Sequence, residues 1–190
     1  MPGFLLQFML PVRDGMELKM KKRFKYPIIA IAVCALLLTI FVPIAGDKKA
    51  GIEGNRVDFG YPLFAARLLM GEPDEESVNT EFPDEWWRYY DREFFDHPAS
   101  IAYCGGYFIV YRIDLKISVS EEEARELFDR VSQSIQNEYK DGDDYYCSPV
   151  TQDGDGTLKQ KIEIRVGAGG KSFEISYQDG ELRAYGDYHY

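Results

Sequence analysis

The loop DGDGT (153–157) contains the residue types that bind hard cations. Calcium is held by several carboxylate oxygens on a tight loop, and an EF-hand places ligands at positions 1, 3, 5 and 12 with glycine at position 6. With Gly156 at position 6, Asp153 and Asp155 occupy positions 3 and 5, but Ile162 stands where the bidentate glutamate belongs. We therefore expect a polar turn that enters a strand, without a cofactor. A Ca²⁺ ion held by Asp153 and Asp155 is the alternative.

The segment DEWWRYYDREFFDHP (84–98) concentrates aromatic residues. Asp84 can cap a helix, and the tryptophan pair, Tyr90 and Phe94 recur at helical spacing, so the pattern predicts a helix with one buried stripe. One stripe cannot bury every ring, and exposed Trp and Tyr beside arginine suit a protein interface, a membrane surface or a stacked sugar. The candidate binding surface is Trp86, Trp87, Tyr89, Tyr90 and Phe95. The alternative is that this helix packs beneath a sheet and buries its rings in the core.

Three cysteines divide between an apolar segment and the rest of the chain. Cys34 lies in the apolar segment, where a thiol behaves as a small hydrophobic group. If the remainder is exported, an oxidising compartment favours a disulfide between Cys104 and Cys147, which would add roughly 4 kcal/mol of stability by the chain-entropy estimate. Two unrelated thiols are the alternative, and the absence of any CxxC spacing argues against a zinc site.

The sequence offers little of what enzymes use. A serine or cysteine nucleophile needs a positioned histidine, and the two histidines of the chain, His97 and His189, belong to no such pattern. The glycine-rich GAGG (167–170) joins two predicted strands and is not followed by a helix, as a phosphate-binding loop would be. Carboxylates are plentiful, so a small hydrolase that uses two of them is the remaining catalytic hypothesis. We expect a non-catalytic protein.

Charge is distributed unevenly along the chain. Residues 1–54 contain 8 Lys and Arg and 4 Asp and Glu, whereas residues 55–190 contain 14 Lys and Arg and 28 Asp and Glu. The acidic part repels phosphate backbones, so we expect no nucleic-acid partner. Basic partners or cations are compatible with this charge.

Residues 27–46 form a 20-residue apolar segment without a charged side chain. At about 1.5 Å per residue, a helix of this length spans the roughly 30 Å hydrocarbon core of a bilayer. Basic residues precede it in KMKKRFK (19–25), which places the N-terminus in the cytoplasm and the following residues outside. A cleaved secretory signal is the alternative, although such signals have shorter apolar regions and a small-x-small exit, unlike Pro-Ile-Ala at 43–45. A buried core helix would show a polar face. We expect a membrane anchor.

The apolar segment and the charge distribution divide the chain into four expected regions. The expected regions are a cytoplasmic leader (1–26), the anchor or signal segment (27–46), a polar tether (47–55) and an acidic extracytoplasmic domain (56–190). Because the basic head of an export signal begins only at Lys19, translation is expected to start at Met16 or Met20, which would leave most of residues 1–19 untranslated.

Periodicity indicates the elements of the acidic domain. Runs of alternating apolar residues predict strands at 107–117, 162–166, 173–177 and 182–188. Ser120 begins a helix whose apolar residues recur at helical spacing as far as Tyr139. Asp179-Gly180, between the last two strands, is a strong hairpin signal. The expected fold class is α+β: after the N-terminal transmembrane or signal helix comes a strand, a helix and a three-strand meander, giving an antiparallel sheet covered by one main helix.

Together these patterns predict a single-pass membrane-anchored protein whose extracytoplasmic domain binds another molecule, with a neighbouring envelope protein as the expected partner. The alternative is a secreted binding or inhibitor domain released by signal cleavage. A calcium-binding domain or a small hydrolase is the third hypothesis.

Overall fold

A computed structural model describes residues 48–78, 84–106, 109–141, 144–166 and 169–189. The predicted leader (1–26) and the predicted anchor (27–46) lie outside the described residues. Within the described part of the chain, neither helix is long and apolar enough to cross a membrane.

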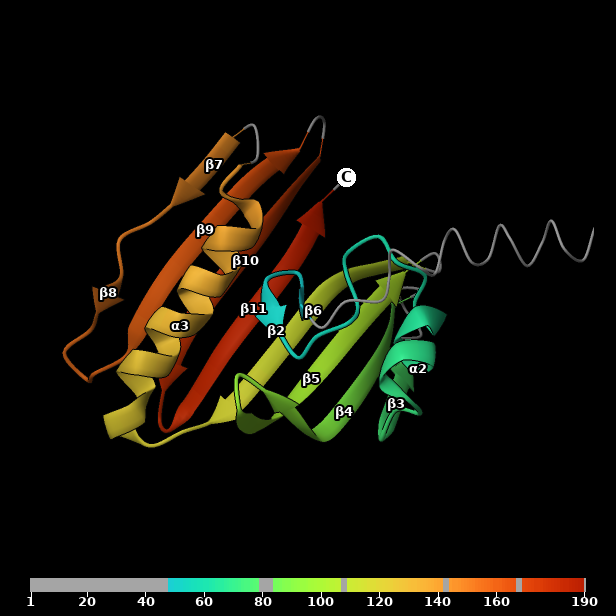
Figure 1. The fold of residues 1–190 in the computed structure, drawn as a ribbon, viewed down its shortest axis with the longest axis horizontal. Coiled ribbons are helices and arrows are strands. Elements are labelled where there is room, and N and C mark those ends of the chain that lie inside the picture. The colour runs from blue at the N-terminus through green and yellow to red at the C-terminus, as the bar shows by residue number, and fades with distance from the viewer. Residues whose placement is uncertain (1–47, 79–83, 107–108, 142–143, 167–168, 190) are drawn as a thin grey trace, which may run out of the picture. The chain divides into compact units, whose positions relative to one another are not determined.

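One large antiparallel sheet dominates the structure (Figure 1). The strands of the sheet are β3 (Glu75–Val78), β4 (Asp84–Phe94), β5 (His97–Gly106), β6 (Ile109–Ser118), β7 (Asp144–Cys147), β8 (Thr151–Gln152), β9 (Leu158–Val166), β10 (Gly169–Gln178) and β11 (Glu181–His189). They pair in the order β3-β4-β5-β6-β11-β10-β9-β7, and β8 also pairs with β9. The remaining elements are a hairpin of β1 (Lys48–Lys49) and β2 (Ile52–Glu53), the short helix α2 (Phe64–Met70) and the long helix α3 (Glu121–Tyr139).

The predicted α+β class is wrong, because strands make up 56% of the described residues and helices only 20%. The predicted strand, helix and three-strand meander correspond to β6, α3, β9, β10 and β11, but they form only part of a nine-stranded sheet. The error arises at residues 84–98, where the aromatic spacing predicts a helix and the chain instead forms β4 and the start of β5.

The turn between β4 and β5 explains why this hairpin escapes the sequence pattern. A two-residue hairpin turn of type I′ needs positive φ at both central positions, which Asn-Gly or Asp-Gly normally provides. Here Phe95 and Asp96 take these positions, with φ of 52° and 63°. The β10–β11 turn does use Asp179-Gly180, with φ of 52° and 81°, and the sequence predicts that turn. The local signal is therefore present in one hairpin and missing from the other.

The core lies between one face of the sheet and a layer formed by α3, the β1–β2 hairpin and the segment that includes α2. Helix α3 crosses β9, β10 and β11 (Figure 1). Its buried stripe includes Leu127, Phe128, Val131 and Ile135, which pack on apolar side chains at alternate positions of the strands, such as Ile162, Phe173 and Leu182. Helix α2 covers the other end of this face, where the Arg67 guanidinium carbon lies 4.6 Å from the centre of the Trp87 ring.

The residues predicted as a tether (47–55) belong to the domain from Lys48 onward. Ala50, Ile52 and Asn55 are fully buried. Gly51, at φ +70°, approaches α3 so closely that an added Cβ would lie 2.6 Å from the Ile135 Cα. From α3, the Arg130 guanidinium donates to the Glu53 carboxylate (2.6 Å) and to the Phe95 carbonyl (3.1 Å), which ties the β1–β2 hairpin to the β4–β5 turn.

The opposite side of the sheet is termed the open face, and it is formed by the strand side chains that point away from α3. In the described part of the chain, both helices and the β1–β2 hairpin lie on the other side (Figure 1). An antiparallel sheet needs only one buried face, so the alternate positions of each strand are free to carry polar groups.

Candidate binding surface

A row of side chains crosses the open face from one edge toward the other. Directly opposed positions of neighbouring strands lie on the same face, at a spacing of about 5 Å. The register places Glu75, Arg88, Ala102, Asp114, Tyr185, Glu174 and Lys161 in one continuous row across β3, β4, β5, β6, β11, β10 and β9. The adjacent row contains Trp86, Cys104, Arg112, Asp187 and Ser172. Residues distant in sequence thus form one surface.

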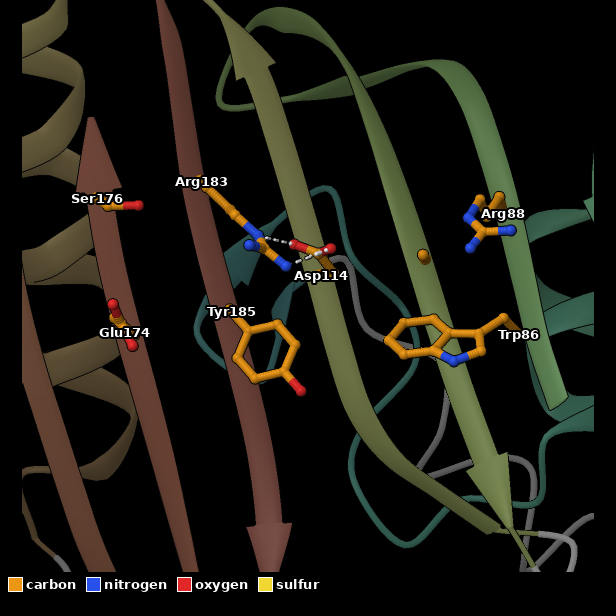
Figure 2. A pocket seen from close by; sticks show the side chains of 8 residues that line it. Trp86, Arg88, Asp114, Glu174, Ser176, Arg183 and Tyr185 are labelled. Atoms are coloured by element: carbon orange, nitrogen blue, oxygen red, sulfur yellow. Dashed lines mark hydrogen bonds and ion pairs between the residues drawn. The ribbon is translucent and has the colours of Figure 1, made fainter. Parts of the chain in front are cut away.

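A pocket of about 490 Å³ lies in the middle of this surface and is termed the central pocket. It is lined by Trp86, Arg88, Ala102, Asp114, Glu174, Ser176, Arg183 and Tyr185. Ala102 stands between Arg88 and Asp114 in the row, and its short side chain leaves the hollow that the longer neighbours surround. Figure 2 shows Trp86 on one side of this hollow and Tyr185 on the other.

Ion pairs hold the two arginines of the central pocket in place. Arg183 donates from Nε to Asp114 Oδ1 at 2.7 Å and from Nη2 to Oδ2 at 2.9 Å, a bidentate pair between β11 and β6 (Figure 2). These hydrogen bonds raise the pKa of the Arg183 guanidinium above its ordinary value. On the other side, Arg88 donates to the Glu75 carboxylate at 2.9 Å. Bidentate arginine–carboxylate pairs are geometrically specific, so the floor of the pocket is preorganised.

Each aromatic ring of the central pocket has an arginine near it. The guanidinium carbon of Arg183 lies 5.1 Å from the centre of the Tyr185 ring, and that of Arg88 lies 5.9 Å from the centre of the Trp86 ring. Burial raises the pKa of the Tyr185 hydroxyl, so the phenol stays protonated at neutral pH and can donate a hydrogen bond. The pocket therefore offers donors, acceptors and stacking surfaces, and neither histidine of the chain lines it.

The structure divides the five aromatic residues that the sequence predicts as a binding surface. Trp86 and Tyr90 lie on the open face, and Tyr90 donates its hydroxyl to the Glu75 carboxylate at 2.7 Å. Trp87, Tyr89 and Phe95 are buried in the core, with 6%, 0% and 2% of their surface exposed. The period of two along β4 sends neighbouring rings to opposite faces, so Trp86 and Tyr90 are separated from the buried rings Trp87 and Tyr89.

The structure does not bring Cys104 and Cys147 together. Both cysteines are free, and they lie on β5 and β7, which are separated by β6, β11, β10 and β9 in the sheet. Five strand spacings amount to about 24 Å along the sheet, whereas a disulfide needs Cα atoms within about 7 Å. The two side chains also point to opposite faces, because Cys104 opposes Trp86 and Cys147 opposes the buried Ile162. A bridge within this domain does not fit the fold.

We expect thiol chemistry to distinguish the two cysteines. In a Cys34→Ser variant, the intact mass should stay unchanged on reduction, and an aromatic disulfide reagent should modify Cys147 quickly and Cys104 only after unfolding. Cys104 is fully buried, its thiol donates to the Tyr111 hydroxyl (3.4 Å), and burial raises its pKa, so its reactive thiolate forms only at higher pH. A mass increase of about two units on reduction would instead show a bridge.

The acidic loop that resembles a calcium site is a hydrogen-bonded turn. The Asp153 carbonyl accepts from Gly156 N at 3.0 Å, and the Asp155 carboxylate accepts from Thr157 N at 3.0 Å. This second bond lowers the pKa of the Asp155 carboxyl. The Asp153 carboxylate lies 3.3 Å from Lys159 Nζ. Among the residues that the structure describes, no three His, Cys, Asp or Glu side chains gather in a way that could hold a metal ion.

Sequence reasoning missed most residues of the central pocket, including Arg88, Asp114, Glu174, Arg183 and Tyr185. A usable signal existed, because a strand with one apolar face presents its alternate residues on the other face. Which of these residues become neighbours depends on strand order, and the sequence did not indicate that β11 lies between β6 and β10. Comparison of the chain with protein-family models, curated proteins and solved structures gives no match.

Proposed function

We propose that this protein is a non-catalytic binding protein that holds another protein on the open face of its sheet. A solvated sheet face alone would not support this, since many antiparallel sheets have one. The observation that carries the proposal is the composition of the face around the central pocket: Trp86 and Arg88 from β4 converge there with Arg183 and Tyr185 from β11. Tryptophan, tyrosine and arginine are the residues most enriched at the energetic centres of protein interfaces.

The shape of the site favours a macromolecular partner over a small molecule. Small-molecule pockets are mainly apolar and enclose their ligand, whereas charged side chains line much of the central pocket. A second hollow of about 170 Å³ adjoins it and shares Arg88, Ala102 and Asp114 with it. A continuous, shallow and preorganised surface of this kind suits the face of another folded protein.

We propose that the apolar segment 27–46 determines where this binding domain is located. As a membrane anchor it would leave the domain outside the cytoplasm. An anchored domain would meet other proteins of the envelope, so its partner would be a neighbouring envelope protein. If the segment is instead cleaved as a signal, the same face would act in a secreted binding or inhibitor domain.

Site-specific cross-linking in the native host tests this proposal. We expect a photoreactive phenylalanine analogue at Ser176, which lines the central pocket, to give a discrete adduct with a second protein. The same analogue at Gln133, exposed on α3 on the other side of the domain, serves as the matched control and should give none. Adding Trp86→Ala should reduce the adduct at position 176 by about tenfold, as expected for a residue at the centre of an interface.

Two results would contradict the proposal. Equal adducts from positions 176 and 133 would show non-specific encounter, and the absence of any adduct at 176 under conditions where the analogue is incorporated would show that the open face has no protein partner. Membrane and medium fractions, analysed separately by intact mass, would show whether the partner is met at the membrane or after release.

A further inference from the structure

The charges of the central pocket are paired with one exception. Arg88 lies 2.9 Å from Glu75, Arg183 lies 2.7 Å from Asp114, and Lys161, next to Glu174 in the row, lies 2.6 Å from Glu163. Among the described residues, the exposed Glu174 carboxylate has neither a hydrogen bond nor an ion pair. Every cation around this carboxylate already has a carboxylate of its own.

The position of Glu174 makes it a docking point for a cation. It opposes Tyr185 on β11, and Figure 2 shows it on the same strand as Ser176, at the margin of the hollow next to Tyr185. An anionic group of a partner would meet an unpaired carboxylate and arginines that are already neutralised. A cationic group would gain a new ion pair and would lie beside aromatic rings, whose faces attract cations.

We infer that the partner protein places an arginine side chain in the central pocket, paired with Glu174 and lying against the Tyr185 ring. Arginine fits better than lysine because its planar guanidinium can donate two parallel hydrogen bonds to one carboxylate and stack on a ring at the same time. This inference rests on the proposed protein-binding function and specifies the chemistry of the partner.

The charge of the whole domain supports a basic partner surface around that arginine. Residues 55–190 contain 28 Asp and Glu and 14 Lys and Arg. A net charge of this sign raises the rate of encounter with positively charged surfaces, and the effect weakens as salt shortens the screening length to about 8 Å at physiological ionic strength. The ion pairs on the open face offset the repulsion between its neighbouring charges. The long-range attraction toward a basic surface therefore acts together with one docking point, the Glu174 carboxylate.

The two tryptophans of the chain provide a direct test, since Trp86 lines the central pocket and Trp87 is buried on the other side of the sheet. The full chain in detergent, labelled with 5-fluorotryptophan, is titrated with the blocked peptide acetyl-Gly-Arg-Gly-amide. We expect the fluorine resonance of Trp86 to shift and that of Trp87 to stay, with an apparent Kd of about 1–10 mM for so small a probe. The neutral isostere, with citrulline in place of arginine, should bind at least fivefold more weakly.

Substitutions test whether Glu174 is the carboxylate that binds the arginine peptide. Glu174→Gln keeps the shape and removes the charge, and we expect it to weaken the arginine peptide about fivefold to tenfold. Glu126→Gln is the control, because it removes an exposed carboxylate from α3, on the other side of the domain, and it should change the Kd by less than twofold. Raising the salt concentration to about 1 M, where the screening length is near 3 Å, should also weaken binding.

Several results would overturn the inference: no shift at Trp86, equal binding of the citrulline peptide, or equal effects of Glu174→Gln and Glu126→Gln. None of them would decide the proposed function, which the cross-linking at position 176 tests independently. If Glu174→Gln leaves the adduct at position 176 unchanged, the proposed protein-binding function would stand and the inference about the partner's arginine would fail.

Discussion

Replacing Trp87 with alanine is expected to lower the free energy of unfolding by about 4 kcal/mol, whereas Trp86→Ala should lower it by less than about 1 kcal/mol. The two residues are adjacent in sequence and chemically identical, but the pleat of β4 sends them to opposite faces of the sheet. Trp87 is 6% exposed, its indole donates to the Glu85 carboxylate at 2.7 Å, and the Arg67 guanidinium covers its ring.

The large loss at Trp87 has two causes. Truncation removes apolar surface that is buried against the core and leaves a cavity that the surrounding strands fill only partly. It also leaves Arg67 above an empty site, although Arg67 keeps its ion pair with Glu72 at 2.8 Å. Trp86 lines the central pocket, and its loss enlarges a hollow that water already reaches, so the cost is small.

Urea-induced unfolding, followed by circular dichroism on the two variants and the parent, measures this difference. The pair serves as its own control, since composition and position in the chain are almost the same. Similar losses in both variants would mean that the rings share one environment, as they would on a helix with a broad buried stripe, and would contradict the alternation along β4. The small loss at Trp86 is also what allows Trp86→Ala to be used as a binding variant.

Local periodicity was sufficient to locate the elements that have one apolar and one polar face. In β6, β9, β10 and β11, alternate apolar residues are buried on the core face of the sheet, and the period of two is visible in the sequence. In β5 the pattern fails, because Ala102 and Cys104 are buried on the open face as well as Ile101 and Tyr103 on the core face. A strand that is buried on both faces shows no alternation of apolar and polar residues in its sequence.

The error over β4 has a different origin. Aromatic residues stand at consecutive positions there, so one choice of spacing matches a helix and another matches a strand. The turn that would have decided between them is made by Phe95 and Asp96 in place of the usual asparagine or glycine. The Phe95 ring is 2% exposed, so tertiary packing supports a backbone conformation that the residue type does not favour.

The central pocket shows the limit of sequence reasoning more directly. Arg88, Asp114 and Arg183 are individually ordinary polar positions of three strands. They become a site because β11 pairs with β6, which sets Arg183 beside Asp114, and because β4 pairs with β5, which sets Arg88 beside Ala102. Strand order is a long-range property, and single-sequence patterns carry little information about it.

Asn55→Ala is the second change from which we expect a large effect, a loss of about 3–4 kcal/mol in the free energy of unfolding. The side chain of Asn55 is fully buried, and its amide makes four hydrogen bonds. Nδ2 donates to the carbonyls of Lys49 and Val57, both at 2.8 Å, and Oδ1 accepts from Val57 N at 3.0 Å and from the Tyr103 hydroxyl at 2.7 Å. One amide thus joins the β1–β2 hairpin to β5.

The expected loss follows from what the alanine leaves behind. Two carbonyls, a backbone N–H and a buried phenol would lose a partner where water cannot replace it, and an unsatisfied buried polar group costs about 1–3 kcal/mol. Burial raises the pKa of Tyr103 well above its ordinary value, so its hydroxyl stays protonated and keeps its need for an acceptor. Tyr103→Phe removes only one of the four bonds and should cost about 1 kcal/mol.

Urea-induced unfolding of Asn55→Ala, Tyr103→Phe and a surface control separates this network from a general effect of losing an asparagine. Asn137 is exposed on α3 and accepts only a 3.5 Å contact from Lys140 Nζ, so Asn137→Ala should change stability by less than about 0.5 kcal/mol. A loss below about 1 kcal/mol in Asn55→Ala would show that the residues from Lys48 to Asn55 do not pack on the domain. They would then be the tether that their composition suggests.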